Sequence, residues 1–122
     1  MPSPQTLERF IAMVESNDHV QACELFYTEQ STMQENQGTP RVGRDAHVAS
    51  ERQVMARAES VTSTCVRPVL VNGDHVAIHW IFEFTFKGGG RMRMEEIAWQ
   101  RWEGDRIAEE QFFYDPAQRK PG

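Results

Sequence analysis

The chain has 122 residues, a formal net charge of −5, and seven Phe, three Trp and two Tyr. This length allows one compact domain with a single core, and the aromatic content argues against a disordered chain. The acidic balance disfavours binding to the phosphate backbone of nucleic acids. The sequence has no apolar run of membrane-spanning length and no signal-peptide pattern at its N-terminus. We therefore expect neither nucleic acid nor a membrane as a partner.

The cysteines and histidines do not form a recognisable metal or disulfide pattern. Cys23 and Cys65 have neither a framework nor a ligand spacing, which favours a reduced, cytoplasmic location. His75 and His79 share one face of an expected strand, but they lie about 13 Å apart along it, too far to ligate one ion. We expect no metal site and no cofactor.

The first half of the chain has helical periodicity. Ser3-Pro4 is typical of a helix N-terminus, and apolar residues follow at i, i+3, i+4 and i+7 from Leu7 to Val14. Asn17-Asp18 breaks this helix, and its aspartate can cap a second one. We expect helices over about 4–16, 18–27 and 43–58, with a short strand over 31–37.

The second half alternates between apolar and polar residues, which is typical of strands. The expected strands are Ser60–Val71, Asp74–Lys87, Arg91–Trp102 and Arg106–Tyr114. Asn72-Gly73, a triple glycine at 88–90, and Gly104-Asp105 join them as hairpin turns. Three helices, interrupted by one strand and followed by an antiparallel meander, predict an α+β fold with the helices on one face of a curved sheet. Residues 117–122 are expected to form a flexible tail.

The order of these motifs resembles a known family over about residues 7–116. The motifs are the Asn-Asp break, a second helix ending Leu25-Phe26-Tyr27, Gly43-Arg44-Asp45-Ala46, Gly73-Asp74-His75-Val76-Ala77-Ile78, and Gly104-Asp105-Arg106-Ile107 followed by Tyr114-Asp115. They are similar to the SnoaL-like (polyketide cyclase-like) branch of the nuclear transport factor 2-like superfamily. The resemblance implies one domain over 1–116, a cone with three N-terminal helices packed on a strongly curved antiparallel sheet. The superfamily includes polyketide cyclases, ketosteroid isomerase, dehydratases, an epoxide hydrolase and non-enzymatic binding proteins.

The hairpin turns predict which side chains share a face of the sheet. They pair Val66 with His79, His79 with Trp99, and Trp99 with Glu110, which defines a face of mixed polarity. The opposite face is apolar, with Ile78, Trp80, Phe82, Phe84, Ala98 and Trp102. From the residues alone, either face could lie under the helices.

The family resemblance favours the mixed face as the inner one. In the resembled enzymes, the residues that match Glu110, Phe112 and Tyr114 point into the cone. The apolar face would then be exposed, and its area would exceed what monomers usually tolerate. We therefore expect a homodimer through the outer sheet face.

Glu110 is the first candidate for a catalytic residue. A carboxylate among Trp99, Phe112 and Tyr114 would be desolvated, and its raised pKa would suit a general acid or base. The alternative is a structural salt bridge between Glu110 and Arg101. Alternation along the strand places Glu109 on the other face.

Three further residues define the expected chemistry. Glu35 lies near the place where ketosteroid isomerase carries its general base, although a slip of one residue would put Gln34 there. His79 could shuttle protons near neutral pH, or it could be a structural histidine of the strand. The expected register favours Glu95 over Glu96 on the pocket side.

The resemblance and the aromatic residues together predict a pocket for a small apolar or aromatic ligand. Its expected ligand-binding residues are Phe10, Tyr27, Trp99, Arg101, Phe112 and Tyr114. We expect a cofactor-free isomerase, cyclase or dehydratase that uses carboxylate acid–base chemistry. The alternative is a non-catalytic module of the same fold that binds a small ligand or only dimerises.

Overall fold

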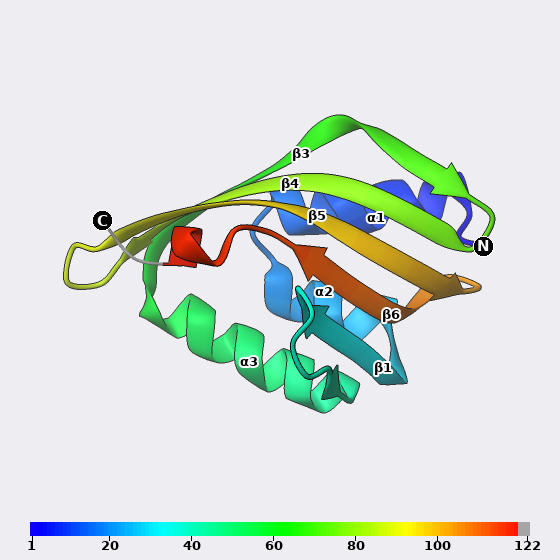
Figure 1. Ribbon diagram of the computed structural model, residues 1–122, viewed down its shortest axis with the longest axis horizontal. Coiled ribbons are helices and arrows are strands. Elements are labelled where there is room, and N and C mark those ends of the chain that lie inside the picture. The colour runs from blue at the N-terminus through cyan, green and yellow to red at the C-terminus, as the bar shows by residue number, and fades with distance from the viewer. Residues whose placement is uncertain (120–122) are drawn as a thin grey trace.

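The computed structural model describes residues 1–119 as three helices and six strands, followed by one 3-10 helix (Figure 1). The elements are α1 (Pro4–Glu15), α2 (His19–Phe26), β1 (Tyr27–Glu35), β2 (Arg41–Val42), α3 (Arg44–Arg57), β3 (Ala58–Asn72), β4 (His75–Phe86), β5 (Arg91–Glu103), β6 (Arg106–Phe113) and η1 (Pro116–Arg119). Residues 117–119 of the expected tail thus belong to η1, and 120–122 lie outside the described residues. Within 1–119, no helix is both long and apolar enough to cross a membrane.

The strands form one sheet in the order β2-β1-β6-β5-β4-β3. The last four strands are the expected antiparallel meander. The sheet as a whole is mixed, however, because β1 runs parallel to β6. Hairpins force neighbouring strands to be antiparallel, whereas β1 and β6 are separated by most of the chain and are free of that constraint.

Helix α1 begins as its sequence predicts. The Ser3 hydroxyl oxygen accepts a hydrogen bond from the Thr6 backbone N–H at 3.0 Å, and Pro4 is the first helical residue. The apolar face of the helix is buried. On that face Phe10 meets the rings of Phe26 and Trp102 edge-on, with centroids 5.5 and 5.9 Å apart. Helix α1 is thereby fixed against both α2 and the sheet.

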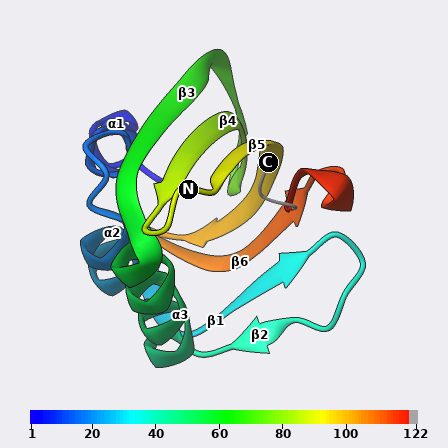
Figure 2. The same ribbon diagram turned by 90° about the vertical axis from the view of Figure 1, so that its left-hand side faces the viewer.

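The sheet curls around the helices into a cup. Figure 2 shows α1, α2 and α3 along one side of the curved strands, whose inner surface is turned toward the helices. The long strands β3, β4 and β5 form the curved wall. This arrangement is the expected α+β cone, and it leaves a concave inner surface that the helices only partly fill.

The apolar face of the sheet lies inside the cup, so the expected assignment of the two faces is wrong. Val76, Ile78 and Ala98 have no exposed surface, and Trp80 and Trp102 are buried beside them. Packing this stripe against the chain's own helices removes it from water without a partner. The stripe therefore forms the core and the cavity wall of a single chain. It is not the exposed patch through which a dimer was expected.

The expected register of β3 and β4 is correct at its centre, because Val66 pairs with His79. The turn itself is displaced: Asn72 pairs with His75, so Gly73 and Asp74 occupy the turn, with Gly73 at a φ of +60°. An irregularity between Val66 and Leu70 compensates for this displacement. It coincides with Pro68, which has no N–H to donate to the ladder.

The loop after β4 is longer than the three glycines, since Thr85 pairs with Arg91. His79 therefore lies opposite Ile97, and Trp99 lies opposite Ala77. This is a shift of two residues relative to the expected register. An even shift leaves every side chain on its original face, so the faces of β4 and β5 match as expected.

The pairing of β5 with β6 contains a bulge that the sequence pattern does not predict. Trp102 pairs with Ile107 as expected, but the next pair is Arg101 with Glu109, which leaves Ala108 as an extra residue. Beyond the bulge the register is displaced by one residue, and Glu110 lies opposite Gln100 instead of Trp99. Glu110 consequently joins the apolar inner face, and Glu109 is turned to the outer face.

Candidate functional site

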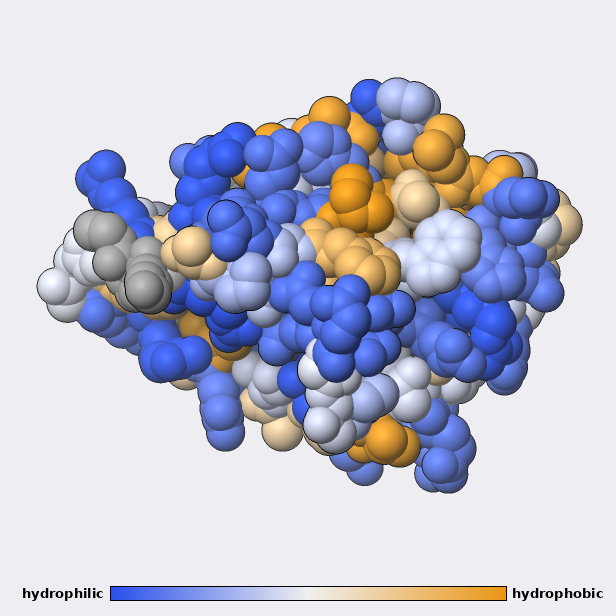
Figure 3. Space-filling view, in the orientation of Figure 1, coloured by the Kyte–Doolittle hydropathy of each residue, from blue (hydrophilic) through white to orange (hydrophobic). Residues whose placement is uncertain are grey.

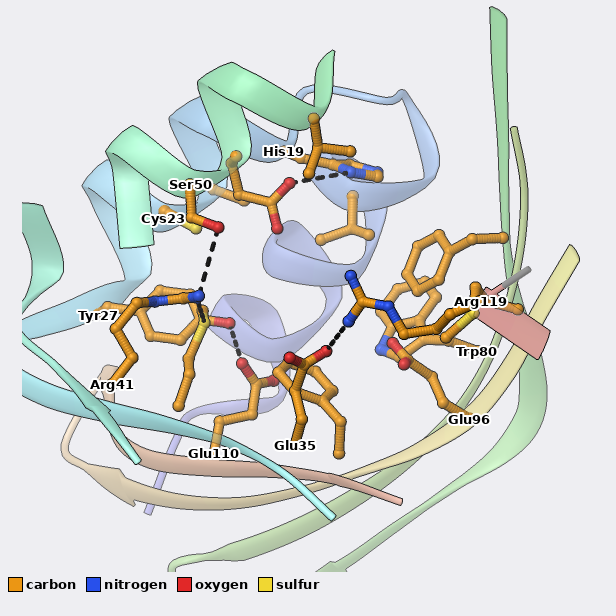
Figure 4. Close-up of a pocket in the computed structure, with 18 of the residues that line it drawn as sticks. His19, Cys23, Tyr27, Glu35, Arg41, Ser50, Trp80, Glu96, Glu110 and Arg119 are labelled. Carbon is orange, nitrogen blue, oxygen red and sulfur yellow. Dashed lines mark hydrogen bonds and ion pairs between the residues drawn. The ribbon is translucent and has the colours of Figure 1, made fainter. Parts of the chain in front are cut away.

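A cavity of about 480 Å³ occupies the cup between the inner face of the sheet and helices α2 and α3. Its apolar wall includes Phe10, Val14, Trp80, Phe82, Phe84, Met94 and Phe112. Its polar residues are His19, Tyr27, Glu35, Arg41, Ser50, Glu51, Glu96, Glu110 and Arg119 (Figure 4). An apolar enclosure with a few convergent polar groups is the usual form of a small-molecule site.

Glu110 on β6 is the most deeply buried of these carboxyl groups, with 3% of its surface exposed. One of its oxygens accepts a hydrogen bond from the Tyr27 hydroxyl. The other accepts from the Gln100 amide nitrogen at 2.6 Å. The Trp102 indole N–H donates to the Gln100 amide oxygen at 2.9 Å, and this orients the amide with its nitrogen toward Glu110.

Burial raises the pKa of Glu110 to about 7, although the hydrogen bonds from Tyr27 and Gln100 oppose the shift. Both donors stabilise the ionised carboxylate, and desolvation disfavours it more strongly. A carboxyl group with this pKa is present in both protonation states near neutral pH. It can therefore accept or release a proton during a reaction.

Two further carboxyl groups in the cavity have a raised pKa. Burial, and then the negative charge of Glu110, raises the pKa of Glu96 to about 8. Burial also raises the pKa of Glu51. In contrast, Glu35 forms an ion pair with Arg119, and its side chain is about half exposed. The cavity thus contains buried carboxyl groups with a raised pKa in its interior, and the Glu35–Arg119 ion pair lies toward solvent.

Glu96 and Glu110 mark two separate parts of the cavity. Glu96 lies opposite Trp80, and Glu110 lies opposite Gln100, four residues farther along β5. Four residues of a strand span about 13 Å. Figure 4 shows Tyr27, Arg41 and Glu110 grouped on one side, and Trp80, Glu96 and Arg119 on the other. A single bound atom cannot meet both carboxyl groups, but an extended ligand can.

His19 lies in the wall near α3. Its Nε2 is 2.8 Å from the Ser63 hydroxyl, and its Nδ1 is 3.9 Å from a Glu51 carboxylate oxygen. Burial lowers the pKa of His19, so the ring is mainly neutral at pH 7. It lies beside Glu51 in the polar part of the wall.

Three expected site residues lie outside the cavity. His79 is on the outer face of the sheet, 2.7 Å from a Glu95 carboxylate oxygen. Trp99 is 45% exposed and stacks on the His75 ring. Arg101 forms an ion pair with Glu109 on the same outer face. The physical cause is the reversed assignment of the faces, which also places Glu95 outside and Glu96 inside.

The other expected residues lie in or near the cavity. Phe10, Tyr27 and Phe112 line it, together with Glu35 and Glu110. Tyr114 is at the rim, where its hydroxyl donates to Glu35 at 2.8 Å. The alternative residue Gln34 donates to the Gly38 carbonyl oxygen instead. Glu110 is not paired with Arg101, which excludes the structural salt bridge considered for it.

Sequence reasoning missed His19 and Ser50 in the cavity, and also four residues with acidic or basic side chains: Arg41, Glu51, Glu96 and Arg119. Glu96 precedes Ile97 in an alternating strand, so a correct assignment of the faces would have found it. Arg41 is on a strand of two residues, and Arg119 is on a short 3-10 helix. Elements this short leave no periodic signal from which a side-chain direction could be predicted.

The described residues offer no obvious place for a metal ion. Among residues 1–119, no group of three or more His, Cys, Asp or Glu side chains is arranged to hold one. Both cysteines are buried and free, and burial raises the pKa of the Cys23 thiol far above neutrality. A protonated thiol is a poor nucleophile and a poor ligand.

Solved structures of the same fold come from several bacteria. A hypothetical protein with a ketosteroid isomerase-like fold from Catenulispora acidiphila, in complex with trimethylamine, has a TM-score of 0.76 and 20% identity, over 95% of this chain and 89% of that chain. A proposed SnoaL-like polyketide cyclase from Mesorhizobium loti has a TM-score of 0.74 and 21% identity, over 90% and 97%. An epoxide hydrolase from M. tuberculosis, similar to LEH, has a TM-score of 0.75 and 12% identity, over 93% and 83%.

At these identities the likeness concerns the fold alone. Among curated proteins, none matches the sequence. The model of the SnoaL-like domain family matches residues 7–110, which include most of α1, every element from α2 to β5, and β6 as far as Glu110. The chain belongs to the SnoaL-like domain family.

Proposed function

We propose that the protein is a cofactor-free enzyme that transfers a proton on a small apolar or aromatic carbonyl compound, as an isomerase, cyclase or dehydratase. Glu110 is the proton acceptor and donor. The observation that carries the proposal is its position: a buried carboxyl group with a pKa of about 7, at the wall of an aromatic cavity. Among solved structures of the same fold, one is described as a SnoaL-like polyketide cyclase and one as an epoxide hydrolase, so the fold is compatible with small-molecule chemistry.

The cavity provides the conditions for this reaction. The phenyl rings of Phe10 and Phe112 give the ligand an apolar wall, so that water is displaced when it binds. Removing water strengthens the basicity of the Glu110 carboxylate toward a carbon acid. In the resting cavity the single Tyr27 O–H proton is donated to Glu110. Once Glu110 has taken the substrate's proton, its carboxyl O–H can donate to Tyr27, and the Tyr27 proton can then be donated to an oxygen that has become negative.

One observation favours a non-catalytic binding module instead. Both oxygens of Glu110 already accept hydrogen bonds, from Tyr27 and Gln100. A carboxylate held in this way can be a structural part of the cavity wall. The two functions differ in one respect that can be measured, namely whether the carboxylate accepts a proton from a bound carbon acid.

The test uses 5-nitrobenzisoxazole, a neutral aromatic carbon acid of a size that fits the cavity. A base removes the proton at C3, the ring N–O bond breaks, and the coloured nitrophenolate forms without any cofactor. We expect saturable turnover whose rate rises with pH through about 7 and then levels off, because only ionised Glu110 can accept the proton.

Glu110→Gln should lower this rate by about 10²-fold or more, the range of general base catalysis. Glu109→Gln is the matched control, since it removes the neighbouring carboxylate on the outer face and should leave the rate unchanged. Equal rates for Glu110→Gln and wild type would refute the role of Glu110. A wild-type rate no higher than that of buffer would favour the binding module.

A further inference from the structure

Arg41 carries a positive charge into the cavity without a carboxylate beside it. Its guanidinium donates from Nε to His47 Nδ1 at 3.2 Å, from Nη1 to the Ser50 hydroxyl at 3.3 Å, and from Nη2 to the Met33 sulfur at 3.1 Å. All three acceptors are neutral. Among residues 1–119, no carboxylate oxygen lies within 4.0 Å of this guanidinium, whereas Arg119 in the same cavity is paired with Glu35.

His47 holds Arg41 without cancelling its charge. An arginine Nε only donates, so His47 Nδ1 must accept and the ring proton must be on Nε2. That Nε2 lies 3.1 Å from the Ser31 carbonyl oxygen, which only accepts, in agreement with this tautomer. Burial, and then the charge of Arg41, lowers the pKa of His47. The neutral imidazole, which has no exposed surface, therefore positions the guanidinium and leaves its charge intact.

Among residues 1–119, the contacts of Arg41 leave N–H donors for a ligand on both terminal nitrogens. A guanidinium has five N–H groups, and three of them are engaged by His47, Ser50 and Met33. One N–H therefore remains on each of the two terminal nitrogens. Two neighbouring donors of this kind match the two oxygens of a carboxylate. A phosphate dianion is disfavoured, because four glutamates line the same cavity and, among residues 1–119, Arg41 is the one unpaired arginine that would face it.

Arg41 also lies on the side of the cavity where Glu110 acts. Figure 4 shows Arg41, Tyr27 and Glu110 adjacent to one another, with Arg119 on the opposite side. We propose that Arg41 binds the carboxylate of a small aromatic or apolar carboxylic acid and so fixes the ligand's orientation in front of Glu110. The inference rests on the proposed function only in that this cavity is the ligand site; it does not require proton transfer by Glu110.

Phenylacetate and its neutral amide, phenylacetamide, are the probes. The two molecules have the same aromatic ring and nearly the same shape. They differ in the negative charge, which only phenylacetate carries and which Arg41 would bind. Each is titrated at millimolar concentration into the full-length protein at pH 7, and binding is measured by NMR shifts of the amides that surround the cavity. We expect phenylacetate to bind about tenfold more tightly or better, because the Arg41 guanidinium attracts an ionised carboxylate more strongly than a neutral amide.

Arg41→Gln should abolish the preference for the carboxylate and leave phenylacetamide binding unchanged. Arg41→Lys keeps the charge but loses the bidentate donor, so it should retain part of the preference. This variant replaces Arg41→Gln in the test if the glutamine variant does not fold. Arg101→Gln is the control: it removes an arginine from the outer face of the sheet, outside the cavity, and should keep the full preference. The proposal is overturned if wild type binds both probes equally or binds neither, or if Arg41→Gln still prefers phenylacetate.

The same titration in Glu110→Gln separates the two proposals. If the carboxylate preference persists there, the Arg41 site is supported whether or not Glu110 transfers protons. If it is lost there but Arg41→Gln retains it, Glu110 and not Arg41 controls ligand binding, and the inference is wrong.

Discussion

The Gln100 amide nitrogen donates to the Glu110 carboxylate across the β5–β6 ladder at 2.6 Å, and the two residues are directly opposite each other in register. Trp102 fixes the orientation of that amide through its indole N–H. Tyr27 donates to the other carboxylate oxygen. The buried acid is therefore held by three residues from two strands, which fixes its position relative to the cavity.

Loss of the Tyr27 hydroxyl should raise the pKa of Glu110 further. Its hydrogen bond stabilises the ionised carboxylate, so Tyr27→Phe removes one of the two interactions that oppose burial. We expect a shift of about one pH unit above the wild-type value. The measurement is the pH dependence of 5-nitrobenzisoxazole turnover, whose midpoint should move to higher pH.

Tyr114→Phe is the matched control, because its hydroxyl hydrogen-bonds Glu35 at the rim and does not reach Glu110. It should leave the midpoint where wild type has it. If both variants shift the profile equally, or if Tyr27→Phe moves it to lower pH, the hydrogen bond does not control the acid.

The buried carboxyl group makes folding stability depend on pH. Its pKa is about 7 in the folded protein and 4.5 when unperturbed, so between these values the folded state binds more protons than the unfolded state. Stability is highest below pH 4.5 with respect to this group, and it is lost as the pH rises through 7. The contribution is on the order of 3 kcal/mol at most.

Glu110→Gln should flatten this decline in the free energy of unfolding between pH 5 and pH 8, within the window that the two pKa values define. Urea unfolding at both pH values measures it. Glu109→Gln should decline as wild type does. A residual decline is expected from Glu96, whose pKa is also raised. An identical pH dependence in Glu110→Gln and wild type would show that Glu110 titrates normally.

The outer face of the sheet still presents apolar side chains, though not the ones expected. Ile97, Trp99 and Phe113 are 41%, 45% and 38% exposed, and they lie on neighbouring strands. Figure 3 shows hydrophobic residues gathered over the upper and central strands of this face, among hydrophilic surroundings. We propose that two copies of the chain associate through this patch, as apolar patches on such surfaces often do.

Trp99→Asp should convert such a dimer to monomers, because it places a charge at the centre of the patch. Leu25→Asp is the control: it makes the same kind of change at a residue of equal exposure, 43%, on helix α2. Light scattering at micromolar concentration measures the mass of each. A monomeric wild type would contradict the proposal. Variants of Trp80 or Phe82 would not test it, because both residues line the cavity.

The sequence predicts the helices and the meander well because their signals are local. The cap at Ser3 and the apolar stripe after it determine α1 within one turn of the helix. The expected turns Asn72-Gly73 and Gly104-Asp105 also place the hairpins, the first with a displacement of one residue. Gly73 and Gly104 both have a φ of +60°, which glycine adopts without strain. Such features need no knowledge of tertiary packing.

The assignment of the sheet faces fails for a reason that no local pattern reveals. The extra residue Ala108 precedes Glu109 and Glu110. Because the two residues are identical, the sequence pattern does not indicate which of them points into the cavity. Two errors cancelled for Glu110. The mixed face was expected inside, although the apolar face lies there, and the bulge moves Glu110 from the mixed face to the apolar one. For His79, Trp99 and Arg101 only the first error applied, and all three lie outside.

The ionisation of Glu110 tests the account most directly. The protein is labelled with ¹³C at the glutamate carboxyl carbons, and their NMR signals are followed with pH, with Glu110→Gln identifying the signal of interest. The account predicts a midpoint near pH 7 for that signal, because burial outweighs the hydrogen bonds from Tyr27 and Gln100. A midpoint near the ordinary value of 4.5 would mean that Glu110 is fully ionised at neutral pH, and it would contradict its role as an acid and base.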